Sequence, residues 1–220
     1  MKLRIAIIPV LAVAMGVVIY AGSTTLGQEK ISSESKATAV QPVNKTIQPK
    51  EYKIATNEAK LIYYKDFNLL DSGTEIVVIG HVVNDNGLYD VKTDDGVVID
   101  QLSQTSIKID EVLKGEIPTD NPVTVMESAV IKDDVLVTLE GYVKMNDQDQ
   151  YLLFLRKTGD NTYAINGTFQ GKFNIEQTKP EEPFQGFTIN EEQLDKVEYI
   201  GDDLEHFNTL KEEALNKYVK

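Results

Sequence analysis

The stretch "YLLFLRKTGDNTYAINGTFQGKF", residues 151–173, carries the clearest structural pattern in this chain. Its apolar run from Leu152 to Leu155 shows no polar alternation, which is typical of a strand buried on both faces. The run leads into the turn residues Thr158-Gly159-Asp160-Asn161, and a second short strand pattern follows. The stretch therefore predicts a β-hairpin at the centre of a small, tightly packed β unit.

More strand patterns precede this hairpin, and turn residues separate them. They cover residues 60–65, 76–83, 88–93, 105–114, 122–127 and 135–145. Turn residues at 85–87 and 94–96 bracket the third of these patterns and predict a meander. Between the first two, Asp66 is expected to cap a helical turn that carries Phe67, Leu69 and Leu70 and ends at Gly73. Val112-Leu113 interrupts an alternating strand, which predicts a bulge.

Short strands at fairly even spacing predict a mainly β protein. We expect an OB-like Greek-key barrel of five or six strands over residues 52–178, with a β-sandwich as the alternative. Residues 179–220 predict a helical C-terminal extension: Asn190 precedes an acidic first turn, and a narrow apolar stripe follows. The stripe consists of Leu204, Phe207, Leu210, Leu215 and Tyr218. It predicts either packing on the barrel or an acidic arm for a partner.

The front of the chain reads as an export segment. Lys2 and Arg4 precede an uncharged, mainly apolar run over residues 5–22, and Ala21-Gly22-Ser23 offers small residues for cleavage. Residues 1–23 are therefore predicted to be a signal peptide or an N-terminal membrane anchor. Residues 24–51 are rich in polar residues and proline and predict a flexible tether. We expect an extracytoplasmic protein, secreted or anchored to the cell membrane by residues 5–22.

The charge balance limits the classes of partner. The chain has 22 Lys and Arg against 35 Asp and Glu. After residue 22 the balance is 20 against 35, which is a net charge of −15. Such a surface repels phosphate backbones, so no nucleic-acid partner is expected. The chain has no cysteine, which excludes disulfides, thiolate metal sites and a cysteine nucleophile.

Motifs of common active sites fail on residue type or spacing. His81 and His206 are the two histidines of the sequence and have no metal-ligand spacing, so no metal is expected. His81 is expected to be a hydrogen-bonded rim or edge residue. No Gly-x-Ser-x-Gly elbow is present. "GTFQGKF" has three residues between its glycines and Phe173 where a phosphate loop needs Ser or Thr, so no nucleotide is expected. The sequence predicts no cofactor and no catalytic residue.

The order "EIVVIGHVV … SIKIDEVLKG … PVTVMES … QYLLFLRK … YAINGTFQGKF" resembles small extracytoplasmic OB-like β-barrel domains of Gram-positive bacteria. These domains are similar in fold to netrin and metalloproteinase-inhibitor modules and have no firmly assigned activity. The resemblance covers residues 63–175. The metalloproteinase inhibitors ligate zinc through an N-terminal cysteine, which this chain lacks, so the resemblance does not imply that activity.

The remaining expectation is recognition of a ligand. OB-like barrels bind through a strand face and loops, with aromatic side chains and polar rims. The predicted ligand-binding residues are Tyr89, Tyr142, Tyr163, Gln170 and Lys172. We expect a non-enzymatic binding or accessory module for a protein or cell-envelope ligand, attached to the membrane through its N-terminal segment. A carboxylate-based hydrolase and an inhibitor-type module are the alternatives.

Overall fold

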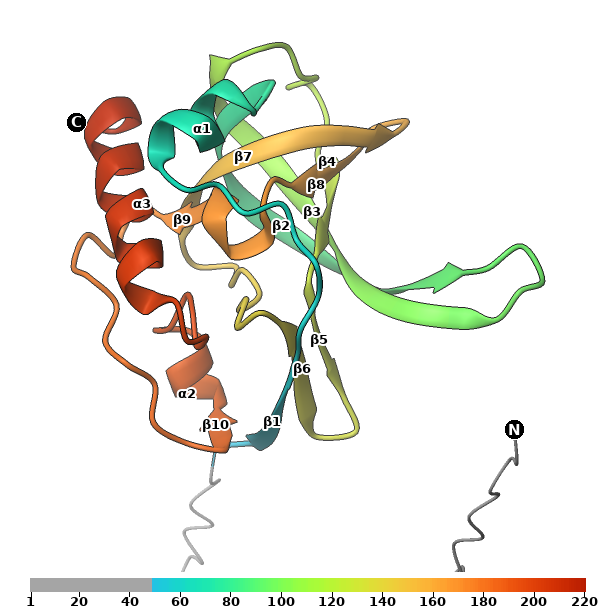
Figure 1. The fold of residues 1–220 in the computed structure, drawn as a ribbon. Helices are drawn as coiled ribbons and strands as arrows, with labels where there is room; N and C mark the ends of the chain where they lie inside the picture. Colours follow the sequence, from blue (N-terminus) through green and yellow to red (C-terminus); the bar gives the residue numbers. More distant parts are fainter. Residues whose placement is uncertain (1–48) are drawn as a thin grey trace, which may run out of the picture. The chain divides into compact units, whose positions relative to one another are not determined.

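A computed structural model describes residues 49–220, and within them the protein is mainly β with a C-terminal helix (Figure 1). The predicted export segment and residues 24–48 of the predicted tether lie outside the described residues. The elements in chain order are β1 (Glu51–Asn57), α1 (Phe67–Ser72), β2 (Ile76–Lys92), β3 (Val98–Lys114), β4 (Val123–Glu127), β5 (Ala129–Lys132), β6 (Val135–Leu139), β7 (Gln150–Gly159), β8 (Thr162–Ile165), the 3-10 turn η1 (Thr168–Gly171), β9 (Lys172–Asn174), β10 (Thr188–Asn190), α2 (Glu191–Leu194) and α3 (Leu204–Tyr218).

Five strands form a closed ring. β2 pairs with β3, β3 with β4, β4 with β8, β8 with β7, and β7 returns to β2. All of these pairs are antiparallel except β4 with β8, which is parallel. β9 pairs with residues 151–153 at the start of β7. The predicted hairpin of residues 151–173 supplies β7 and β8, and its turn falls at residues 160–161, within the predicted turn.

A second sheet has the strand order β10-β1-β6-β5. In this sheet β1, the first strand of the described chain, pairs with β10, the last strand, on one side and with β6 on the other. The sequence patterns did not predict β1, β5 or β10 as strands. The mainly β class with its helical extension is confirmed, and two sheets are also compatible with the sandwich alternative.

The core fills the ring and continues under the C-terminal helix. Leu152, Leu153, Phe154 and Leu155 of β7 have no exposed surface, so the prediction of a strand buried on both faces is confirmed. The rings of Phe67 from α1, Phe173 from β9 and Tyr218 from α3 each lie edge-on, about 6 Å from the ring of Phe154. α1, α3, β7 and β9 therefore share one apolar interior.

The acidic C-terminal segment packs on the β structure. Phe207, Leu210 and Leu215 of α3 are buried, and Leu204 and Tyr218 are partly buried against the same core. The predicted apolar stripe is thus the packed face of the helix. Asn190 caps α2 as predicted, since its side chain accepts a hydrogen bond from the Gln193 backbone N–H.

Local predictions around the ring have mixed outcomes. Asp66 caps α1 and Gly73 ends it, both as predicted. The β2–β3 register shifts by one residue at Leu113, which confirms the predicted bulge. The strand predicted for residues 60–65 is wrong. That segment is irregular, because its backbone groups bond to a side chain: Tyr64 N–H donates to Gln170 Oε1 at 2.7 Å.

Candidate functional site

Four of the five predicted ligand-binding residues have buried side chains. Tyr142, Tyr163, Gln170 and Lys172 are at most 2% exposed, whereas Tyr89 is 48% exposed. The structure brings Tyr142 and Lys172 together but does not gather the five on one surface. Their role in binding stays a prediction, and Tyr89 is the member of the set that lies open to solvent.

Gln170 and Lys172 have partners inside the protein. Gln170 Nε2 donates to the carbonyl of Ile62 at 3.0 Å, so the side chain pins the irregular segment that precedes α1. Lys172 Nζ donates to the carbonyl of Val143 at 2.6 Å and lies 4.6 Å from the centre of the Tyr142 ring. Burial lowers the pKa of Lys172. Both side chains thus bond to backbone carbonyls of other segments, and that of Val143 belongs to a buried residue.

A buried carboxylate holds the junction between the ring and the second sheet. Glu127, at the end of β4, accepts hydrogen bonds from the Tyr142 hydroxyl at 2.6 Å and from the Met145 N–H at 2.8 Å. It also accepts one from the Thr105 hydroxyl of β3. Its oxygens therefore accept from three donors, one in β3 and two in the segment between β6 and β7, and sequence reasoning did not single it out.

A second buried carboxylate ties α3 to β9. Glu198 and Lys211 form an ion pair in which both side chains are 3% exposed. Glu198 also accepts a hydrogen bond from the Asn174 N–H at 2.5 Å. Burial raises the pKa of Glu198, while Lys211 opposes the rise. Glu181 lies near this pair, and burial, together with the charge of Glu198, raises its pKa to about 7. This cluster fastens the C-terminal segment to the ring.

The histidines and acidic residues form no metal centre within residues 49–220. No group of three or more His, Asp or Glu side chains in this range has suitable geometry. His81 Nδ1 lies 2.7 Å from Asp110 Oδ2 on the neighbouring strand, so the expected hydrogen bond is present. His81 is the last residue of the β2–β7 ladder and has strand partners on both sides, so it lies at the rim of the ring and not at a free strand edge. A cavity of about 480 Å³ beside η1 is lined by Glu58, Glu140 and Tyr63, among others.

We also find that no helix within residues 49–220 is long and apolar enough to cross a bilayer.

The most distinctive surface feature is a hairpin arm, defined here as residues 84–102. β7 covers β2 from Ile76 to His81 only, and β4 covers β3 only from Ser103 onward. Beyond these limits β2 and β3 pair with each other alone and project away from the ring (Figure 1). The arm ends in the turn at residues 93–97, as its sequence predicts.

The turn predicted at residues 85–87 is wrong, and this error concealed the arm. Asp85-Asn86-Gly87 lies inside β2 as an irregularity, because Asp85 still pairs with Thr105 and Leu88 with Ser103. Gly87 has φ of 83°, which lets the strand continue past the extra residues. The predicted meander is therefore one long two-stranded arm.

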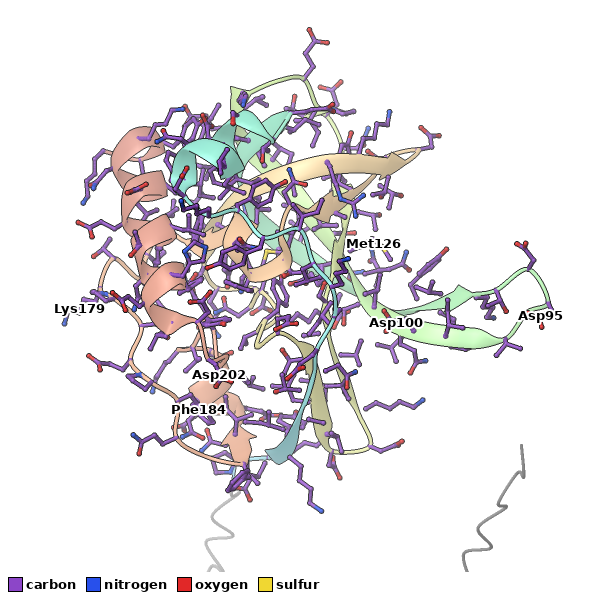
Figure 2. The ribbon with its side chains drawn as sticks, viewed as in Figure 1. Asp95, Asp100, Met126, Lys179, Phe184 and Asp202 are labelled. Carbon is purple, nitrogen blue, oxygen red and sulfur yellow. The ribbon has the colours of Figure 1, made fainter. Side chains whose placement is uncertain are left out.

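The arm exposes apolar side chains and acids together. Its exposed large apolar residues are Leu88, Tyr89, Val97, Val98 and Ile99. It carries Asp85, Asp90, Asp94, Asp95 and Asp100 against one cation, Lys92, so five acids and one base give a net charge of −4. Figure 2 shows Asp95 at the far tip of the arm and Asp100 nearer its base. Several exposed apolar side chains on a projecting element make it a candidate interaction site.

A cleft separates the arm from the second sheet. It has a volume of about 450 Å³, and its walls are β3 of the arm and the β5–β6 pair. The lining residues are Asn57, Asp90, Val98, Ile99, Asp100, Gln101, Val130, Lys132 and Val137. At its apex the Ser103 hydroxyl donates to the Ala129 carbonyl at 2.6 Å, which joins the two walls. Cleft and arm form one continuous candidate surface.

No protein-family model matches the sequence, and a search of curated proteins finds no relative that matches.

Proposed function

We propose that this protein is a non-enzymatic binding module that recognises a protein partner through the hairpin arm. The observation that carries the proposal is the run Val97–Ile99, whose three side chains are each at least 45% exposed on an element that projects beyond the ring. Leaving such side chains in water forgoes the stabilisation that burial of apolar surface provides. A partner that covers them supplies that burial.

The connectivity of the ring supports an OB-like type of barrel. If the five ring strands are numbered along the chain from β2 to β8, leaving out β5 and β6, their order around the ring is first, second, third, fifth, fourth. The third and fifth strands, β4 and β8, are parallel. In OB-like barrels the loop between the first and second strands is one of the ligand-binding loops. The arm occupies this place in the chain, and its position supports a recognition role.

The two alternatives find different support. A hydrolase needs two accessible carboxylates at one cleft. Glu58 and Glu140 line the cavity beside η1 and keep the hydrolase as an alternative, whereas Glu198, whose pKa burial raises, is 3% exposed and paired with Lys211. An inhibitor-type module needs an ordered projecting edge, and the arm is such an edge. Inhibition is therefore the second candidate function, as a special case of binding a protein partner. If the captured partner is a proteinase, its activity with and without added protein tests inhibition.

We place this module outside the cytoplasm, attached through residues 5–22. The support is the order of two cations followed by an apolar run. Fusion of residues 1–50 to a phosphatase that is active only after export tests the location. We expect phosphatase activity from this fusion and none from a fusion that lacks residues 1–22.

Photo-crosslinking tests the binding surface. A photoreactive phenylalanine at Ile99, on the arm, is compared with one at Phe187, which is 90% exposed elsewhere on the protein. In cells that produce the protein we expect a discrete adduct from position 99 and none from position 187. Equal adducts from both positions, or none from either, would contradict the proposal.

A further inference from the structure

We propose that the cleft between the arm and β5 binds an extended polypeptide segment, which pairs as an added strand with the open edge of β3 at residues 98–102. The segment carries lysine or arginine side chains beside apolar ones. This inference rests on the proposed binding function and adds the chemical class of the partner and its mode of binding.

The cleft has two open strand edges. β3 pairs with β2 on one side, and on its other side β4 ends its pairing at Ser103. β5 is the outermost strand of the second sheet and pairs with β6 alone. β4 and β5 are separated by one residue, Ser128, so the two walls diverge from a common apex. The backbone groups of residues 98–102 on this side have no strand partner, although the Gln101 N–H donates to Asp100 Oδ1 at 2.8 Å and Ile99 is a bulge in the register with β2. Strand addition would complete this edge, with the Asp100 side chain giving up that hydrogen bond.

The open edge of β3 is unusually apolar for an edge strand. Soluble proteins commonly protect such edges with charged side chains or proline. Here the sequence is "VIDQL", and Asp100 is its single charge. Val98 and Ile99 line the cleft from β3, and Val130 and Val137 line it from the second sheet. In an added strand alternate side chains project to opposite faces of the sheet, so the apolar side chains that face the second sheet have apolar contacts available there.

Charge selects the kind of segment. Asp90 and Asp100 lie in the cleft with Lys132, whose Nζ donates to Gln101 Oε1 at 3.3 Å across the opening. Asp90 also pairs with Lys92 of the arm at 3.5 Å, which leaves Asp100 as the acid of the cleft without a cation beside it among the described residues. The arm as a whole has a net charge of −4. Electrostatic complementarity therefore favours a basic segment. The same charge disfavours a second copy of the arm, and Asp94 and Asp95 at the tip disfavour an anionic membrane surface.

The test uses the folded protein and two synthetic peptides. The first is an acetylated, amidated heptapeptide of alternating lysine and valine, and the second has glutamate in place of lysine. We expect the lysine peptide to bind at least tenfold more tightly than the glutamate peptide. Hydrogen exchange should slow at residues 98–102 when the lysine peptide is bound.

Charge-reversed variants locate the interaction. Asp90→Lys with Asp100→Lys should weaken binding of the lysine peptide at least tenfold. Asp94→Lys with Asp95→Lys makes the same change in charge at the arm tip and should alter binding less than twofold. Equal weakening by both pairs, equal binding of both peptides, or no protection of residues 98–102 overturns strand addition.

The proposed function fails separately from this inference. If crosslinking at Ile99 captures a protein partner while the lysine peptide does not bind, strand addition is wrong and the arm remains a binding surface. If Ile99 captures nothing, the binding function itself is wrong. Self-association of the protein in sedimentation, lost on Asp100→Lys substitution, identifies the occupant as a second copy and overturns the basic partner.

Discussion

The two halves of strands β2 and β3 differ sharply, although each half belongs to a continuous strand. Residues 76–82 of β2 are buried apart from the half-buried His81, whereas residues 83–89 of the same strand are all exposed. The first half has β7 beside it and the second does not. Strand formation and burial are thus separate properties: the ladder between β2 and β3 persists after the core has ended. The ring half carries stability, and the arm half is free to carry recognition.

The largest expected contrast is between a ring side chain and an arm side chain. Phe154→Ala removes a ring with no exposed surface and should lower the free energy of unfolding by about 3–5 kcal/mol. Ile99→Ala removes a side chain that is 64% exposed and should change it by less than about 0.5 kcal/mol. Urea unfolding of both variants measures the difference. A cost above 2 kcal/mol at Ile99, roughly that of a core truncation, would mean that the arm is packed after all.

The next effect tests the buried ion pair that joins α3 to the ring. Lys211→Ala leaves the Glu198 carboxylate buried without its cation and should cost about 3–5 kcal/mol. Replacing both residues together, by Lys211→Met and Glu198→Leu, should cost less than the single change, because no charge is then left unpaired. Thermal and chemical unfolding give both values. A double variant that is less stable than Lys211→Ala would show that the pair is net stabilising.

Two glycines with similar backbone angles separate conformational strain from crowding. Gly115 has φ of 76°, and a Cβ there would lie 2.2 Å from the carbonyl oxygen of Glu75. Gly87 on the arm has φ of 83°, and a Cβ there would meet nothing within 4 Å. We expect Gly115→Ala to cost about 3 kcal/mol and Gly87→Ala about 1 kcal/mol. Equal costs would show that crowding at the ring is relieved by movement of the backbone.

The smallest expected effect is a pH dependence of the free energy of unfolding that comes from Glu181 in the C-terminal segment. The pKa of Glu181 is about 7 in the folded protein, above its ordinary value of 4.5. The folded state therefore holds this proton more tightly than the unfolded chain, and its contribution to stability is lost as pH rises through 7. Glu181→Gln should remove on the order of 1 kcal/mol of that loss, discounted because the side chain is partly exposed. Unfolding at about pH 5 and about pH 8 in both proteins measures it, with Glu182→Gln as the matched control.

The sequence predicted the centre of the fold better than its margins. The apolar run of β7, the caps of α1 and α2 and the bulge at Leu113 follow from local residue chemistry, so the sequence patterns identified them. β1 and β10 were not predicted, because each becomes a strand only by pairing with a segment that lies far away in the chain, and β10 has only three residues. Such pairing is a tertiary effect that no local pattern reports.

The candidate site was harder to predict for a specific reason. Asp85-Asn86-Gly87 has the composition of a turn, and a positive φ at Gly87 suits a turn or a bulge equally well. The register with β3 decides between them, and it is set by residues 103–106 of the opposite strand. Tyr89 was predicted as a ligand-binding residue from its type and lies on the arm. The exposed run Val97–Ile99 was the available clue to a surface that the patterns did not reveal.

The position of β1 has a mechanical consequence. This strand lies inside its sheet, with β10 on one side and β6 on the other. A pulling force transmitted through the residues ahead of Glu51 would meet two hydrogen-bonded ladders at once, one of them formed by the segment next to α2. β1 would therefore resist mechanical unfolding, because pulling it out of the sheet requires its hydrogen bonds to β10 and to β6 to break together.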